Sequence, residues 1–162
     1  MKQKDDHTAH PVLRHWREEV PDDRLAHLIR DAARVLTKSM QTRLSEHSVS
    51  FGHWAFLRVL WVTEGLTQRE LSDQVGLMEP TTFTALKAME ALGLIERRFE
   101  DGNRKKVHIY LTPKGRELKH VLIPIAEELN EIAVRGLSES EIKTVHRAML
   151  AIIQNLVEAG AV

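Results

Sequence analysis

The spacing of apolar residues between positions 67 and 93 predicts two short helices joined by a tight turn. Leu71 and Val75 lie one turn apart in the first helix, and Gly76 supplies the left-handed residue that commonly ends a helix. In the second helix the apolar residues gather on the side of Thr82, at Ala85, Leu86, Met89 and Leu92. Two helices joined by a glycine-containing turn are typical of a helix-turn-helix.

Both helices carry start and stop signals. Thr67 and Glu70 have the spacing of a capping box, in which each side chain caps the backbone N–H of the other residue. Pro80 suits the first turn of the second helix, because the N–H that proline lacks would have no helical partner there. Gly93 is placed to end that helix. The second helix is therefore predicted to run from Pro80 to Gly93.

The second helix leaves one face free of core-forming residues. This face is small and hydroxylic with a single cation, and it contains Pro80, Thr81, Thr84, Lys87 and Ala88, with Phe83 on its flank. Such a face suits the major groove of DNA, where Thr can bond base edges or phosphates and Phe can contact a thymine methyl group. For this helix alone, an ordinary amphipathic helix with a solvated face is the alternative.

A basic hairpin is predicted directly after these helices. Residues 94–99 and 106–111 are strand-like runs rich in β-branched or aromatic residues, and they flank a turn-rich hexapeptide at 100–105. Residues 96–116 hold seven Lys or Arg against three Asp or Glu, a net charge of +4 in a chain whose formal total is zero, whereas residues 117–162 carry −3. A charge run alone usually marks a solvated face. After a helix-turn-helix it predicts a DNA-binding wing, because neutralising phosphates supplies most non-specific affinity.

Helical periodicity continues on both sides of this unit. It predicts helices at residues 22–46, 51–63, 112–135 and 138–158, the third interrupted and kinked by Pro124. The first and last of these have apolar faces, formed by Leu25, Leu28, Ile29, Ala32, Val35, Leu36 and Met40 and by Ile142, Val145, Met149, Ile152, Ile153 and Leu156. Burial of each such side chain contributes roughly 1.5–3 kcal/mol, so these faces indicate a partner that covers them. A monomeric helical bundle is the alternative.

Composition is that of one ordinary globular domain. The 162 residues are 28% charged and 43% hydrophobic. There is no cysteine, which excludes a disulfide framework, a thiolate zinc site and a nucleophilic thiol. The first residues lack the apolar segment of a signal peptide, and the longest strictly apolar run, residues 148–153, is too short to cross a membrane. We therefore expect no association with a membrane.

Neither a metal site nor an active site is predicted. Three of the nine histidines, His7, His10 and His15, lie near the N-terminus, and the histidines do not form the pattern of Cys or carboxylate ligands on a common element that is usual in zinc sites. No motif pairs a nucleophile with a base, forms a phosphate loop or singles out two facing carboxylates. We therefore expect a protein that is not an enzyme and that needs no cofactor.

Several of these segments together resemble one known family. Residues 67–71 (TQREL), 80–82 (PTT), 91–98 (ALGLIERR) and 111–116 (LTPKGR) are similar to the MarR (multiple antibiotic resistance regulator) family of winged-helix repressors, a likeness that extends over residues 21–157. The resemblance implies a cytoplasmic bacterial or archaeal transcription regulator. It also implies an obligate homodimer that a phenolic or carboxylated ligand releases from DNA. The absence of cysteine excludes the cysteine-based peroxide sensing of one branch of the family.

Two positions depart from the family pattern. The wing tip often reads Asp-Arg-Arg, whereas this chain has Asn103-Arg104-Lys105, and Asp101 is placed to supply the missing carboxylate. The second helix of the helix-turn-helix often carries an Arg where Thr84 stands. The first departure concerns which residue holds the Arg104 side chain in place. The second concerns which DNA sequence the protein prefers.

The predicted fold is mainly α with a small β-hairpin wing. Residues 1–20 are an N-terminal extension, 21–50 and 112–162 a helical dimerisation region, and 51–111 a winged helix-turn-helix lobe. The residues expected to contact DNA are Thr67, Gln68, Pro80, Thr81, Phe83, Thr84, Lys87, Arg97, Asn103, Arg104 and Lys105. By the family resemblance, an effector pocket is expected between the two regions, lined by Trp16, His53, Trp54, Arg58 and Trp61.

These predictions describe a repressor that binds a pseudo-palindromic operator, with two recognition helices about 34 Å apart in successive major grooves. A winged-helix module that binds other proteins and not DNA is the alternative function. For Trp54 and Trp61, simple packing in the core is the alternative role.

Overall fold

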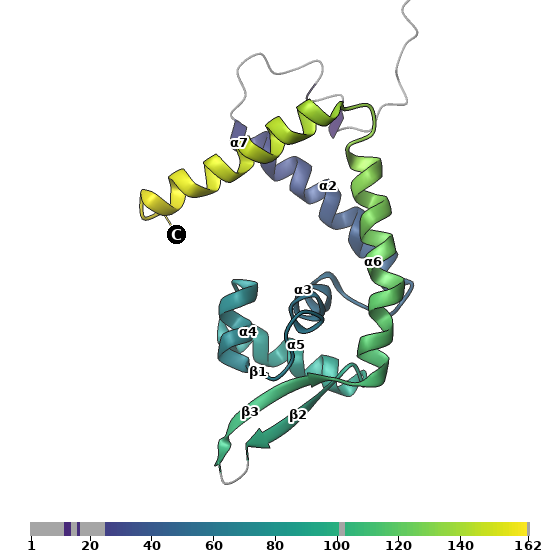
Figure 1. Cartoon of the computed structure of the whole chain (residues 1–162), viewed down its shortest axis with the longest axis vertical. Helices are drawn as coiled ribbons and strands as arrows, with labels where there is room; N and C mark the ends of the chain where they lie inside the picture. The colour runs from purple at the N-terminus through teal and green to yellow at the C-terminus, as the bar shows by residue number, and fades with distance from the viewer. Residues whose placement is uncertain (1–11, 14–15, 17–24, 101–102, 162) are drawn as a thin grey trace, which may run out of the picture.

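The computed structural model describes residues 12–13, 16, 25–100 and 103–161, with side chains at all of these except residues 100 and 103–106. Most of the predicted N-terminal extension, including Val20 and the N-terminal histidines, therefore lies outside the described residues. So does the predicted start of the first helix at residues 22–23. The described chain is mainly helical with a small antiparallel sheet (Figure 1), as the sequence predicted.

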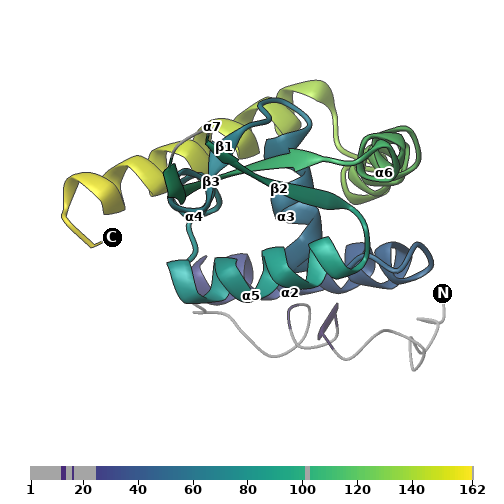
Figure 2. The ribbon, with the colours of Figure 1, turned by 90° about the horizontal axis from the view of Figure 1, so that it is seen from below.

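The middle of the chain forms a winged helix-turn-helix lobe. Its elements are α3 (Phe51–Leu60), β1 (Leu66–Thr67), α4 (Gln68–Val75), α5 (Glu79–Ala91), β2 (Ile95–Glu100) and β3 (Asn103–Leu111). The predicted helices at 67–76 and 80–93 correspond to α4 and α5 within a residue or two. The hairpin of β2 and β3 lies at one end of the molecule in Figure 1, and Figure 2 shows it beside α5 from below.

The sheet differs from the prediction in two ways. The strand order is β1-β3-β2, and the two-residue strand β1, which pairs Leu66 with Ile109, was not predicted. The predicted hexapeptide turn at 100–105 is wrong, because Glu100 already pairs with Asn103 and both strands extend further than expected. The polar residues of this segment lowered its apparent strand propensity, but pairing across the hairpin outweighs local propensity. Asn103, Arg104 and Lys105 therefore belong to β3 rather than to the turn.

The hydrophobic core lies under α5 and against the sheet. Its fully enclosed members include Phe56, Leu57, Leu60, Leu71, Leu86, Met89, Ile95, Ile109 and Leu111. Thr82, Leu86 and Met89 of α5 are all buried, which confirms the predicted inward face of this helix, although Leu92 at its end is exposed. The opposite face of α5 is thereby left toward solvent.

Three long helices complete the described chain. They are α2 (Leu25–Ser45), α6 (Pro113–Ala133) and α7 (Glu139–Glu158), the last opening with the predicted capping box between Ser138 and Glu141. α6 begins beside the hairpin and leads to the end of the molecule where α7 lies (Figure 1). It continues through Pro124 as one helix, so the expected interruption is wrong; Pro124 is exposed, where water can hydrate the carbonyl that proline leaves unbonded.

The outer helices expose the apolar faces that the sequence assigned to them. α7 has no buried side chain, and among its exposed residues are Val145, Met149, Ile153 and Leu156. On α2, Leu25, Leu28, Val35 and Leu36 are exposed as well. The residues that the structure describes in a single copy leave these faces uncovered, which argues against the monomeric bundle.

Candidate nucleic-acid interface

The first helix of the helix-turn-helix is held at both ends by local bonds. The Thr67 amide donates to Glu70 Oε2 at 2.7 Å, and the Glu70 amide donates to Thr67 Oγ1 at 3.3 Å, so the predicted capping box is present. Gly76 adopts φ 71°, and its amide donates to the Ser72 carbonyl. That left-handed residue turns the chain toward α5, as the sequence predicted.

The predicted free face of α5 is exposed as a unit. Pro80, Thr81, Phe83, Thr84 and Lys87 all lie on the solvent side of the helix. The Thr84 hydroxyl donates to the Pro80 carbonyl at 3.0 Å, so toward a base it acts as an acceptor while that bond persists. No side chain caps the start of the helix at Met78, which is 77% exposed.

The predicted contacts at the start of α4 are less free than those of α5. The Thr67 hydroxyl donates to Glu70 Oε2 at 2.8 Å, so it is already engaged in the capping box. Gln68, the first residue of α4, is partly exposed. Among the predicted polar contacts whose side chains the structure describes, the exposed ones are Thr81, Thr84 and Lys87 on α5.

The hairpin contributes cations beside that face. The backbones of Asn103, Arg104 and Lys105 belong to β3, whereas their side chains lie outside what the structure describes. On β2, the Arg98 guanidinium stacks over the Tyr110 ring at 4.4 Å and pairs with Glu96. This stack was not predicted, because sequence spacing does not show which residues face each other across a hairpin.

Arg97, which was predicted to contact DNA, packs against α5 in this structure. Its side chain is only 20% exposed, and its Nε lies 3.2 Å from Glu90 Oε2 on α5. Its guanidinium carbon is 5.4 Å from the centroid of the Phe83 ring. In this arrangement Arg97 faces α5 and not the solvent.

An ion pair that the sequence did not reveal fixes the base of the wing. Arg116 on α6 donates to both oxygens of Glu64, from Nε at 2.9 Å and from Nη2 at 2.8 Å, and the Leu111 amide donates to Glu64 Oε2 at 3.0 Å. Burial raises the pKa of the Glu64 carboxyl, but these hydrogen bonds and the Arg116 charge outweigh burial and hold the pKa below its ordinary value. No local pattern signals a pair separated by 52 residues.

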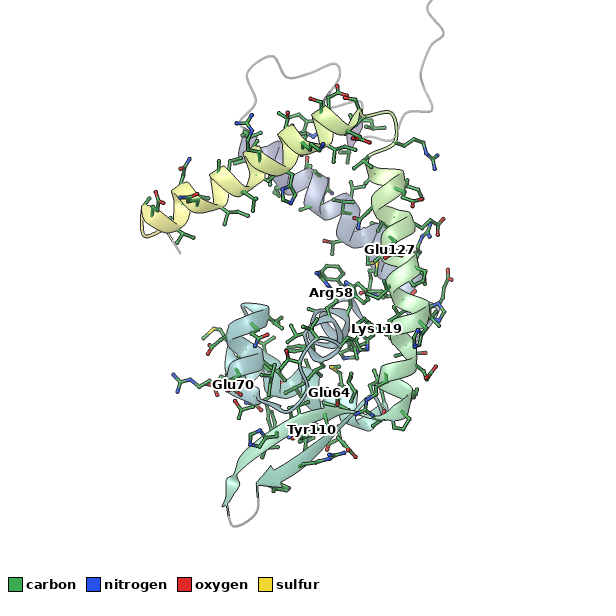
Figure 3. All side chains as sticks on the ribbon, viewed as in Figure 1. Arg58, Glu64, Glu70, Tyr110, Lys119 and Glu127 are labelled. Atoms are coloured by element: carbon green, nitrogen blue, oxygen red, sulfur yellow. The ribbon has the colours of Figure 1, made fainter. Side chains whose placement is uncertain are left out.

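Two cavities lie against α3 and α6. One, of about 540 Å³, is lined by apolar residues together with Trp61, Arg58, Gln74 and Lys119. The other, of about 420 Å³, is lined by Trp54, Arg58, Met40, Ile123 and Glu127, among others. Figure 3 shows Arg58 and Lys119 on the facing elements α3 and α6, with Glu127 further along α6. The structure thus brings three of the five predicted pocket residues, Trp54, Arg58 and Trp61, to these cavities.

The other two predicted pocket residues are not among the lining residues of these cavities. Trp16 donates from Nε1 to Asp31 Oδ2 at 3.2 Å on α2. His53 directly precedes Trp54 on α3. Its side chain points in a different direction, because successive positions of a helix are about 100° apart. Burial lowers the pKa of the His53 imidazole, and its Nδ1 is enclosed without a hydrogen-bond partner.

Trp54 and Trp61 are also packing residues. Trp54 is 6% exposed and belongs to the core, and its ring meets Trp61 edge to face at 5.6 Å. Trp61 donates from Nε1 to the Gly115 carbonyl at 2.9 Å, which ties α3 to the first turn of α6. Arg58 lies 6.0 Å over the Trp54 ring. The alternative of core packing therefore holds for both tryptophans alongside their place at the cavities.

The part of the chain that the structure describes also bears on metal binding and on membranes. In that part, no group of three or more His, Asp or Glu residues is placed to hold a metal ion. No helix there combines the length and the apolar character that crossing a membrane requires.

Comparison with known proteins points to one group of regulators. Residues 49–107 match the family model described as the MarR family. The HTH-type transcriptional regulator TtmR of Methylorubrum extorquens is 32% identical over 98 residues, which are 60% of this chain, and the chain spans half the length of that relative. The organic hydroperoxide resistance transcriptional regulator of Bacillus subtilis is 26% identical over 135 residues, 83% of this chain and 90% of the relative.

The same architecture occurs in a solved structure of a protein bound to DNA. The S. aureus MepR–DNA complex matches with a TM-score of 0.77 over 83% of this chain and 100% of that chain. Its sequence is 21% identical, so this likeness concerns the fold.

Proposed function

We propose that this chain, a member of the MarR family of transcription regulators, is a homodimeric repressor that a small aromatic, phenolic or carboxylated ligand releases from its operator. Its family consists of regulators and not of enzymes. The chain contains no cysteine, so peroxide sensing through a thiol is not part of the proposal, although one relative is named for hydroperoxide resistance.

One observation carries the proposal for DNA binding. The free face of α5, with Thr81, Thr84 and Lys87, is exposed immediately beside a hairpin whose sequence is strongly basic. In a major groove, the two hydroxyls would accept bonds from base edges and Lys87 would neutralise a phosphate. Pro80 and Phe83 would add apolar contacts, and Thr67 and Gln68 would lie at the rim of the same surface.

The wing would contact the neighbouring minor groove. Asn103, Arg104 and Lys105 lie in sequence close to the hairpin turn, and arginine is attracted to the narrow, negative minor groove of A·T-rich DNA. We therefore assign these three residues to phosphate and minor-groove contacts.

The proposal for a homodimer rests on the apolar faces of α2 and α7. A second copy of this chain would cover them and would set two α5 helices about 34 Å apart, the spacing of successive major grooves. Light scattering at micromolar concentration should give about twice the 18.5 kDa mass of one chain. A stable, folded monomer at that concentration would contradict the operator geometry.

The ligand proposal rests on Arg58, which lines both cavities beside α3. In one of them Lys119 and Gln74 add a second cation and an amide, next to Trp61. An apolar wall with two cations suits a flat acidic or phenolic ligand. Such a ligand can lower DNA affinity only as far as it binds a DNA-incompetent arrangement more tightly.

A salt titration separates this function from protein binding alone. We would select duplexes from random-sequence DNA with the full-length protein and measure affinity by fluorescence anisotropy over a range of salt concentrations. A specific duplex should emerge, with log affinity falling linearly in log salt by about 0.9 per neutralised phosphate. Recovery of no duplex and no salt-dependent binding would favour the protein-interaction module. Tryptophan fluorescence with aromatic carboxylates, with and without the duplex, would then test the ligand.

A further inference from the structure

Arg97 and Arg98 are adjacent on β2 but occupy different environments. The Arg98 side chain is 59% exposed and pairs within the hairpin, whereas that of Arg97 is 20% exposed and turned toward α5. Successive residues of a strand point to opposite faces of the sheet, so this difference follows from the register of β2. Of these two arginines, Arg97 is the one that contacts α5.

Arg97 contacts α5 at two positions. It pairs with Glu90 at 3.2 Å and lies 5.4 Å from the centre of the Phe83 ring. Positions 83 and 90 are seven residues apart, which is two helical turns, and they therefore lie on the same side of α5. One guanidinium thus spans two turns of the helix from the neighbouring strand.

Two of the three guanidinium nitrogens of Arg97 are shielded from solvent. Nε and Nη2 are enclosed and have no aligned hydrogen-bond partner, although Nε is close to the Glu90 carboxylate. A phosphate could reach these atoms only after the guanidinium had left the Phe83 ring. Phe83 itself is 46% exposed, so one part of its ring meets Arg97 while the rest is open.

We propose that Arg97 is a positioning residue for DNA recognition: it holds Phe83 and the wing strand at a fixed angle to α5 and does not itself bind phosphate. This inference rests on the proposed DNA-binding function. The guanidinium is suited to the role because its plane stacks on an aromatic ring while its edge meets a carboxylate. Lysine has the same charge but not this shape.

The test compares Arg97→Lys with Arg98→Lys, using the selected duplex and the dimeric full-length protein. Both substitutions keep the charge of the wing, and both remove a guanidinium from an aromatic ring. A lysine binds phosphate as a point charge. If the role of Arg97 were only to bind a phosphate, a lysine at this position would largely preserve the DNA affinity. We expect Arg97→Lys to weaken binding about five- to thirtyfold, and Arg98→Lys to change it less than about twofold.

Two further measurements distinguish positioning from phosphate contact. Arg97→Gln should leave the salt slope unchanged, whereas loss of a phosphate contact lowers the slope by about 0.9. The losses of DNA-binding free energy caused by Phe83→Leu and by Arg97→Lys should not add in the double variant. Arg97→Lys already removes the guanidinium that orients the Phe83 ring. Should Arg97→Lys fail to fold, Glu90→Gln breaks the same link from the helix side and is also expected to weaken binding.

The outcomes separate this inference from the proposed function. Wild-type affinity for Arg97→Lys, a reduced salt slope for Arg97→Gln, or additive effects with Phe83→Leu would each overturn the positioning role while leaving DNA binding intact. Tighter binding by Glu90→Gln would also overturn it, because a released Arg97 would then be reaching the DNA. If the wild-type protein binds neither selected nor random duplexes, the proposed function is wrong and the inference falls with it.

Discussion

Gly115, in the first turn of α6, lies so close to neighbouring atoms that no residue with a Cβ atom fits at this position without a shift. A Cβ atom at this position would lie 2.1 Å from the Leu94 carbonyl oxygen and 3.1 Å from Leu111 Cδ2. The clashing oxygen belongs to the backbone of Leu94, a residue of the core. The clash therefore cannot be relieved by moving the end of a flexible side chain. Gly115→Ala should therefore force the first turn of α6 away from the lobe.

The cost can be assembled from the contacts that this shift would disturb. Overpacking of a tight site costs about 1–3 kcal/mol. The same movement would strain the bond from the Thr112 amide to the Leu94 carbonyl at 3.1 Å and the bond from Trp61 Nε1 to the Gly115 carbonyl at 2.9 Å. Each is worth about 0.5–1.5 kcal/mol, while alanine returns about 1 kcal/mol of helix propensity. The expected net loss is about 3 kcal/mol in the free energy of unfolding.

Gly52, in the first turn of α3, provides the matched control. A Cβ there would meet only Ser50 Oγ, at 3.7 Å, which is an ordinary contact. Gly52→Ala should therefore be neutral or stabilise the protein by up to about 1 kcal/mol. Urea unfolding followed by circular dichroism, at one fixed protein concentration because dimerisation would add to stability, measures both variants. A loss under about 0.5 kcal/mol for Gly115→Ala, or equal losses for both, would refute the packing argument.

Two other residues give predictions about stability. Because the pKa of Glu64 lies below its ordinary value, its ionised form stabilises the fold above about pH 4.3, and this contribution is lost as the pH falls through the folded-state pKa. Glu64→Gln should thus unfold at lower urea than wild type near neutral pH and converge with it in acid; a constant difference at every pH would contradict this. Thr82 is fully buried and its hydroxyl has no hydrogen-bond partner, so Thr82→Val should raise stability by about 1 kcal/mol in the same assay, and a loss would show that the hydroxyl is satisfied.

The parts of the fold that were predicted correctly are those specified by neighbours in sequence. The capping box of Thr67 and Glu70 and the inward face of α5 around Thr82 depend on residues within a few turns of one helix. Their energies are local, so spacing alone reveals them. The same holds for the second capping box, at the start of α7.

The parts that were missed depend on pairing at long range. The strand β1 has only two residues and exists because Leu66 pairs with Ile109 on β3. The Glu64–Arg116 pair joins the segment between α3 and β1 to the first turns of α6, 52 residues further along the chain. The contact of Arg97 with α5 was not predicted, because strand register decides the direction of this side chain and register is set by the partner strand.

The remaining question is how a ligand beside α3 could influence DNA binding at α5, and α6 supplies the physical connection. Its first turn is bonded to the lobe through the Gly115 carbonyl and Trp61, while further along Glu128 pairs with Arg43 of α2. Ile123, between these two attachments, lines both cavities. A ligand at either cavity would therefore contact the segment that sets the lobe relative to the proposed dimer helices. In the proposed dimer, two α5 helices would have to match the spacing of successive major grooves, so a small change in the position of the lobe relative to the dimer helices would lower DNA affinity.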